Sequence, residues 1–221
     1  MIAAARSLAA FARRLRDDRS AMAFTEFALS LPVLLGLGLT GLEAANLALT
    51  HLRVSNIAVL TADSAARVRD TIDEANIADI FEGVRRAGGS LKNFPQNGRV
   101  ILSSVEPNTA GAGGATTGQY IRWQRCLGVL GRASVYGAEG TGKTSSVLPS
   151  ITYKGNTIAA QSGTAVMVVE VSYTYQPLVS AKIFGPKTVT YVSAFNVRQR
   201  LDQTLYNATK MTAATCDKFL P

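Results

Sequence analysis

Histidine and cysteine are almost absent from this chain of 221 residues, which contains one histidine and two cysteines. Soft metal ions such as zinc are bound by several such side chains at short, regular spacings, so we expect no metal centre. Charged side chains are also few, at 17%. This fraction is below the usual quarter of a soluble protein, and it is typical of a chain with one segment in lipid.

Negative charge is in deficit as well, with 15 aspartates and glutamates against 23 lysines and arginines. The excess is most concentrated before Met22, where the basic residues are Arg6, Arg13, Arg14, Arg16 and Arg19. No later basic cluster is interleaved with aromatic residues, so we expect no nucleic acid as a partner. A basic flank before an apolar helix instead indicates that the N-terminus stays in the cytoplasm.

A long apolar run follows this flank. Residues 27–42 carry no charge, and up to Leu52 the only charged side chain is Glu43. About 20 apolar helical residues cross a bilayer. We therefore expect a basic cytoplasmic leader over residues 1–21 and a long helix over residues 22–70, with its first half in the membrane. Pro32 should bend or loosen this helix locally, because it removes one backbone hydrogen bond.

Two patterns distinguish the faces of the expected helix. Beyond His51, apolar residues recur at helical spacing and indicate docking on a domain: Val54, Ile57, Ala58, Ala62, Ala65 and Ala66. Small residues recur at spacings of three and four, where a second helix backbone could approach closely: Gly38, Gly41, Ala45 and Ala48. An ordinary background of glycine and alanine is the alternative explanation of this stripe.

Residues 71–221 predict an extracytoplasmic α+β domain. A capping-box pattern at Thr71–Glu74 begins a second, short helix, which Gly88 and Gly89 end. Strands are indicated at residues 99–105, 119–125, 164–175 and 188–197, whereas residues 128–163 are poorly patterned. The connection between the last two strands is short, so we expect them to form an antiparallel pair in a β-sheet.

Both cysteines, Cys126 and Cys216, lie in the expected outer domain. An oxidising compartment would allow a disulfide, which would tether the C-terminal tail. The alternative is two unrelated buried thiols.

One stretch, Gly137–Thr144, matches the phosphate-binding loop pattern letter for letter. Its context does not fit, because residues 131–136 make a poor core strand and Pro149 falls where the following helix should run. We interpret the stretch as a flexible loop, and nucleotide binding through Lys143 is only a remote alternative. No nucleophile has a base partner that the sequence identifies, so we expect a protein that is not an enzyme and has no cofactor.

One carboxylate, Glu26, lies at the start of the apolar run. An ionised carboxylate in hydrocarbon costs several kcal/mol unless it meets a partner. The sequence therefore indicates either a partner or an interfacial location for Glu26.

The segment that contains this residue, Ala23 to Leu35, resembles the N-terminal signature of TadE-like proteins, the pseudopilins or minor pilins of the tight-adherence (Tad) pilus system. The last two expected strands fit the family too, together with Pro177, Phe184, Gly185 and Arg198. The resemblance implies a pilin-like fold and a role in pilus assembly, with other pilin-like subunits, Tad assembly components and membrane lipid as partners.

The resemblance also implies cleavage by a prepilin peptidase of the bacterial inner membrane. With Glu26 as the fifth mature residue and Phe27 after it, the cut falls between Ala21 and Met22, although the family usually has glycine before the cut. The new amine could neutralise Glu26 within one helix or between subunits. The expected topology is a single pass with a periplasmic C-terminal domain, which could enter a surface pilus. An uncleaved single-pass scaffold of the same machinery is the alternative.

Overall fold

The computed structural model describes residues 20–108, 118–144, 148 and 150–221. Most of the expected leader, residues 1–19, therefore lies outside the described residues. The chain divides into two compact units, residues 1–46 and 47–221. Each unit is described by itself.

Helix α2, Ser20–Arg67, is the long apolar helix that the sequence predicts, and it runs through both units. It continues past Pro32 without interruption. By length and composition, Met22–Arg67 can cross a membrane, with a mean hydropathy of 1.7 over its apolar window. The second unit begins at Leu47, because the C-terminal part of α2 shares the core of that unit.

The second unit is an α+β domain built on a four-stranded antiparallel sheet in the order β3–β2–β6–β7. Its strands are β2 (Gly98–Pro107), β3 (Gln119–Leu127), β6 (Val166–Thr174) and β7 (Thr188–Asn196). All four predicted strands are thus confirmed. The expected antiparallel pair is β6 and β7, with Val171 opposite Tyr191.

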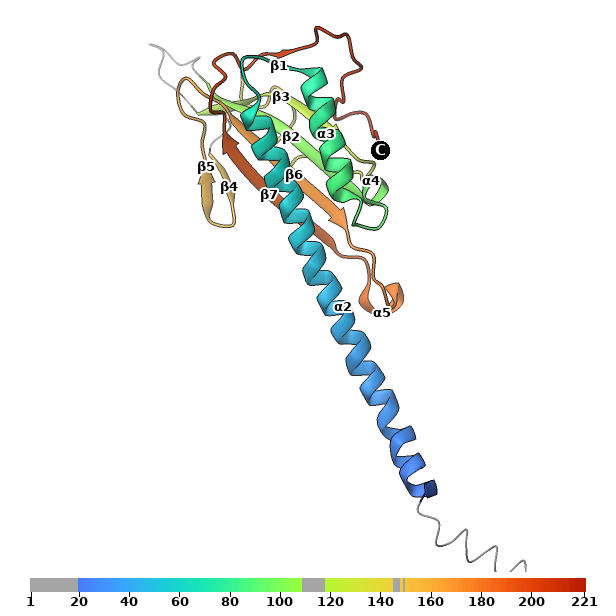
Figure 1. The fold of residues 1–221 in the computed structure, drawn as a ribbon. Helices are drawn as coiled ribbons and strands as arrows, with labels where there is room; N and C mark the ends of the chain where they lie inside the picture. Colours follow the sequence, from blue (N-terminus) through green and yellow to red (C-terminus); the bar gives the residue numbers. More distant parts are fainter. Residues whose placement is uncertain (1–19, 109–117, 145–147, 149) are drawn as a thin grey trace, which may run out of the picture. The chain divides into compact units, whose positions relative to one another are not determined.

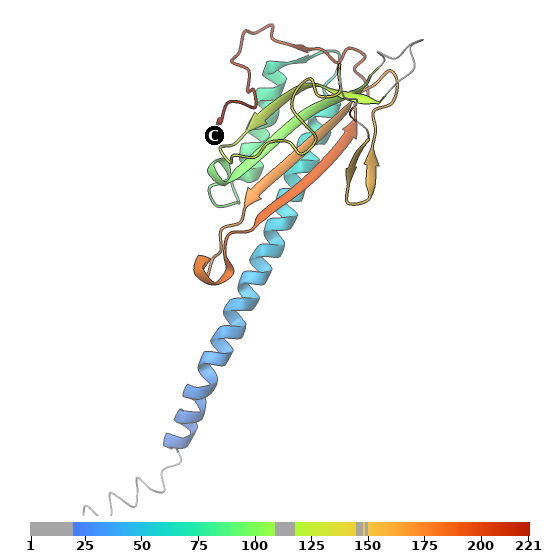
Figure 2. The ribbon, with the colours of Figure 1, turned by 180° about the vertical axis from the view of Figure 1, so that it is seen from behind.

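The C-terminal part of α2 and helix α3, Glu74–Gly88, cover one face of this sheet (Figures 1 and 2). The predicted apolar face of α2 is confirmed, because Val54, Ala62 and Ala65 are fully buried in the core between helices and sheet. The alternation of strand residues explains the other side of this core, where Val169 and Val171 of β6 face the helices.

The start of α3 differs from the prediction. Asp73, and not Thr71, is the N-cap, since its carboxylate accepts a hydrogen bond from the Ala75 amide at 2.9 Å. The Asn76 side chain accepts one from the Asp73 amide, which completes the capping box. Aspartate caps as well as threonine does. Residues Ile72–Asp73 also form β1, which pairs in parallel with β8, Leu205–Tyr206.

The opposite face of the sheet is covered by part of the poorly patterned stretch, residues 128–163. It contains an unpredicted hairpin of β4, Ile151–Tyr153, and β5, Asn156–Ile158. Ile151 and Ile158 pack on Val168 of the sheet in a second apolar cluster. Two short helices, α4 (Phe94–Asn97) and α5 (Ala181–Phe184), complete the described elements.

The C-terminal tail lies along the outer edge of β3. Cys126 and Cys216 form a disulfide, so they are not unrelated thiols. The Cys126 amide donates a hydrogen bond to the Ala214 carbonyl at 2.8 Å, and the buried Arg99 donates one to the Cys216 carbonyl at 2.6 Å. The tail thereby covers an edge that would otherwise present unpaired backbone groups.

Candidate functional site: the apolar helix and the groove beside α3

Within the first unit, the described residues present an exposed apolar helix surface. Every described side chain from Met22 to Leu42 is exposed, and the large apolar ones range from 38% exposed at Leu31 to 78% at Leu29. Removing one such side chain from water stabilises a structure by about 1.5–3 kcal/mol. Lipid or other helices would stabilise a surface of this length by covering it.

The polar side chains within this surface are compatible with lipid. The hydroxyls of Thr25, Ser30 and Thr40 donate hydrogen bonds of 2.8–3.0 Å to backbone carbonyls one turn earlier in α2. An unpaired hydroxyl in hydrocarbon would cost free energy, and this back-bonding removes the cost. The Ser30 bond also lies beside Pro32, where the helix ladder lacks one donor.

The residues of the expected processing site lie at the start of α2. The bond between Ala21 and Met22 falls in its first turn, because the helix begins at Ser20. Met22 and Phe27 are 62% and 57% exposed. Glu26 is exposed too, and its carboxylate forms no hydrogen bond or ion pair with another residue that the structure describes. The described residues therefore provide no counter-ion for this carboxylate.

The small-residue stripe is free in the described chain. Gly38, Gly41, Ala45 and Ala48 are all exposed. A Cβ atom added at Gly38 or Gly41 would meet no atom within 4 Å. These glycines therefore serve no packing function within the described fold, whereas the close approach of another helix backbone would use them.

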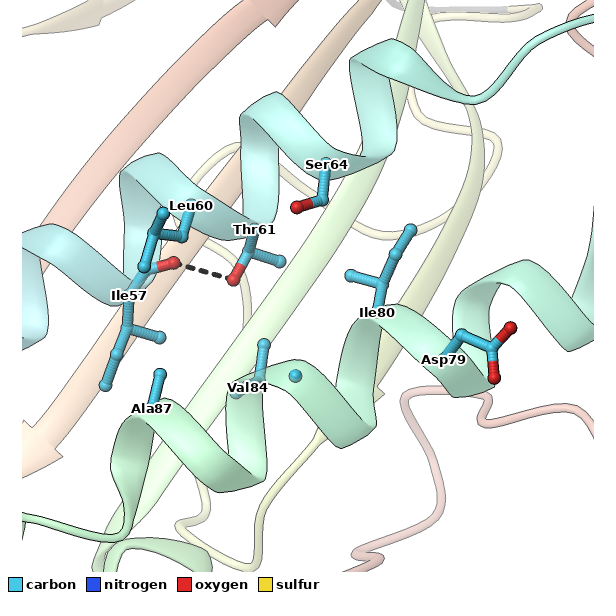
Figure 3. Close-up of a pocket in the computed structure, with 9 residues that line it drawn as sticks. Ile57, Leu60, Thr61, Ser64, Asp79, Ile80, Val84 and Ala87 are labelled. Atoms are coloured by element: carbon cyan, nitrogen blue, oxygen red, sulfur yellow. Dashed lines mark hydrogen bonds between the residues drawn. The ribbon is translucent and has the colours of Figure 1, made fainter.

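A groove of about 390 Å³ lies between α2 and α3 in the second unit (Figure 3). Its lining is mainly apolar, and its one buried hydroxyl is already engaged, since Thr61 donates to the Ile57 carbonyl at 2.6 Å. It offers an apolar contact surface without a nucleophile and base in hydrogen-bond contact. The lining residues are Ile57, Leu60, Thr61, Ser64, Asp79, Ile80, Gly83, Val84 and Ala87.

The phosphate-loop match does not have phosphate-loop geometry. The Gly140 amide donates to the Ile121 carbonyl at 2.8 Å, and the Lys143 amide donates to the Gly140 carbonyl. The Glu139 carboxylate accepts from the Gln124 amide at 3.0 Å. Amides and a carboxylate used in this way bind the loop to β3 and do not cradle an anion. In addition, the described residues between Gly137 and β6 contain no helix.

Lys143 lines a polar pocket of about 530 Å³ beside this loop. Two other charges of this pocket form an ion pair, in which Arg122 contacts the Glu106 carboxylate at 3.0 Å, and Arg122 also contacts the Thr204 hydroxyl at 2.6 Å. Tyr120 donates a further hydrogen bond to Glu106. The arrangement is that of an internal ion pair at the sheet edge.

A buried carboxylate, Glu170 on β6, has a shifted pKa. Desolvation raises its pKa, although hydrogen bonds from the Ser134 hydroxyl and the Val135 amide act in the opposite direction. Perturbed carboxyl groups often mark active sites. Here both oxygens hold the loop that covers the sheet, so the contacts are structural.

In the described part of the chain, no three His, Cys, Asp or Glu side chains are placed to hold a metal ion. The sequence analysis did not identify the groove or the role of Glu170. The spacing of Gly83 and Ala87 was an available signal for the groove, because small residues one turn apart leave space on a helix face.

A comparison of the chain with protein-family models, with curated proteins and with solved structures found no match. The resemblance to TadE-like proteins therefore rests on the residues of the sequence.

Proposed function

We propose that this chain is a membrane-anchored pseudopilin or minor pilin of the TadE-like type, which acts in the assembly of a Tad pilus. The observation that carries the proposal is Glu26, the one carboxylate among the side chains from Met22 to Leu42, all of which are exposed. A simple anchor needs the apolar surface, and it tolerates a carboxylate at the headgroup interface but does not require one. A helix that assembles with others does have a use for it.

In this account, the leader remains in the cytoplasm, α2 crosses the inner membrane and the second unit lies in the periplasm. The basic leader supports this orientation, and the disulfide between Cys126 and Cys216 is typical of an oxidising compartment. The protein works by packing against pilin-like helices and the assembly machinery, without catalysis.

Cleavage between Ala21 and Met22 supplies the missing counter-ion. The new α-amine is four residues before Glu26, which is about one helical turn or 6 Å along the axis. It pairs with Glu26 of its own helix or of a neighbouring subunit. In an apolar bundle, a pair between subunits also fixes the axial register, because only one offset brings the two groups together.

Co-expression with a prepilin peptidase tests this function by intact mass. We expect loss of residues 1–21 from the wild-type chain, faster loss in Ala21→Gly, and none in Ala21→Leu, which places a branched side chain before the cut. Ala28→Leu is the matched control, since it makes the same change at an exposed position of the same helix, and it should be cleaved like the wild type.

The alternative function is an uncleaved single-pass scaffold of the same machinery. A mass that stays at full length in both the wild type and Ala21→Gly would favour this alternative over the pilin-type role. The remote nucleotide-binding alternative requires binding that Lys143→Ala abolishes, and the loop contacts of Glu139 and Gly140 count against it.

A further inference from the structure

One end of the second unit, which we call the proximal end, is defined by Gly98, Tyr173 and Val189, neighbours across β2, β6 and β7. Helix α2 enters the unit near this end, because the His51 ring lies 5.9 Å from the ring of Tyr191, near the start of β7. The helix leaves at the opposite end, where the Ala66 carbonyl accepts a hydrogen bond from the Arg198 amide.

Chain connectivity places the proximal end close to the membrane of the proposed function. Residues 22–42, as a helix, are about 31 Å long, which matches the hydrocarbon core of a bilayer. Leu47, the first residue of the second unit, follows Leu42 by about 8 Å of helix. Headgroup layers occupy the outer 5–8 Å or so of each leaflet, which is about the length of this connection.

The loop between β6 and β7, which contains α5, is at this end (Figures 1 and 2). It exposes two large apolar side chains, Leu178 at 60% and Ile183 at 75%. Lys182 and Lys187 are exposed beside them. No aspartate or glutamate occurs between residues 171 and 201 of the sequence, so the loop is basic as well as apolar.

Two further loops add lysines to the proximal end. The Lys92 carbonyl accepts a hydrogen bond from the Tyr173 hydroxyl at 2.9 Å, and the Lys154 amine lies 4.4 Å from the centre of the Tyr191 ring. Both side chains are exposed. The acidic residue in the last turns of α3, Glu82, is paired with Arg86 at 3.1 Å. The end therefore presents net positive charge.

We propose that the α5 loop inserts into the headgroup layer of the membrane that holds α2, with anionic lipid as its partner. Leu178 and Ile183 occupy the boundary between headgroups and acyl chains, as apolar residues of interfacial segments do. Lys92, Lys154, Lys182 and Lys187 contact lipid phosphates. This inference rests on the membrane anchoring of the proposed function, and it adds a second attachment that fixes the orientation of the outer domain.

The test uses the full chain in vesicles of phosphatidylcholine with about one-third phosphatidylglycerol, some of it brominated in the acyl chains. Three variants each place a tryptophan probe: Ile183→Trp in the loop, Leu35→Trp in the anchor, and Leu201→Trp as a control. Leu201 is 91% exposed and follows Arg200, which contacts the Val68 carbonyl at the opposite end of the unit. The natural Trp123 is buried and gives a constant background.

We expect bromolipid to quench the probes at residues 35 and 183 and to spare the probe at residue 201. Quenching at residue 183 should weaken when phosphatidylglycerol is omitted. In each of the variants Lys182→Gln and Lys187→Gln, about fivefold more lipid should be needed to reach the same quenching at residue 183. Quenching at residue 35 alone would overturn the inference and leave the anchor intact. No quenching at residue 35 would instead contradict the membrane anchor. Fluorescence of the probe at residue 183 that changes with the density of protein in the vesicles, and not with bromolipid, would show contact between copies of the chain. This result would also overturn the inference.

Discussion

At the scale of single residues, the account depends on Glu26. We expect Glu26→Gln to leave membrane insertion unchanged, because the apolar run from residue 27 to residue 42 is intact. Pilus assembly should fall at least tenfold, because the counter-ion pair and its register are lost, and a paired charge in an apolar site contributes well over 1.4 kcal/mol. Membrane fractionation and counts of sheared pili measure the two effects.

The control for this substitution is Glu82→Gln, which removes an exposed carboxylate of α3 that takes part only in surface ion pairs. It should assemble like the wild type. Normal piliation in Glu26→Gln would contradict the proposed role of this residue.

Glu170 predicts a pH dependence of stability. Burial raises its pKa above the ordinary 4.5, so just above pH 4.5 the folded chain still holds a proton that the unfolded chain has released. The free energy of unfolding should therefore fall as the pH rises from 4.5 through the raised pKa. Glu170→Gln cannot ionise and should lack this fall. Thermal unfolding of the full chain in detergent, from about pH 4 to about pH 7, compares the two. Parallel pH profiles would contradict the prediction.

At the scale of elements, α2 has faces with separate tasks. Gly41→Leu should leave the thermal unfolding of the chain unchanged, because the added side chain meets open space. It should weaken association of α2 with other helices by about tenfold, since the close backbone approach is lost. Energy transfer between labelled chains in bilayers measures the association.

Gly36→Leu is the matched control for this face. Gly36 is also exposed, with open space around its Cβ position, but it does not share the spacing of Gly38, Gly41, Ala45 and Ala48. Equal association of both variants would show that the stripe is only background.

The disulfide between Cys126 and Cys216 stabilises the tail along β3. It closes a loop with a sequence separation of 90, for which the loop-entropy relation gives about 4–5 kcal/mol. The double variant Cys126→Ala and Cys216→Ala should therefore unfold many degrees below the wild type in calorimetry. The wild type with a reducing agent should shift in the same direction, whereas reduction should not affect the variant. An unchanged midpoint would contradict this contribution.

The elements differ in how well the sequence predicted them, for physical reasons. Helix α2 and strands β2, β3, β6 and β7 have long, regular apolar patterns, and their predictions are confirmed. The β4–β5 hairpin was missed because each strand has three residues, which is too short for a period to be read. The true N-cap, Asp73, was missed because Thr71 and Asp73 are both good capping residues.

The candidate site was predictable only where its chemistry is local. Glu26 and the small-residue stripe stand out in the sequence because a charge in an apolar run and a spacing of three and four are visible there. The groove between α2 and α3 depends on how Leu60 and Ile80 meet across two helices. The exposed apolar α5 loop depends on which loops share one end of the sheet. Neither is a property of one segment.

At the scale of the whole molecule, the chain combines a helix that needs an apolar environment with a disulfide-linked domain that has its own core. The proposed work of the molecule is to assemble, through the apolar surface of α2 between Met22 and Leu42. Cleavage of the leader connects the assembly of the whole molecule with the single residue Glu26, because it creates the amine that this carboxylate needs.

The most direct test of this account is the intact mass of the protein isolated from the envelope of its own cells. The account predicts a mature chain that begins at Met22 and keeps the disulfide between Cys126 and Cys216. A chain that still begins at Met1 would contradict it.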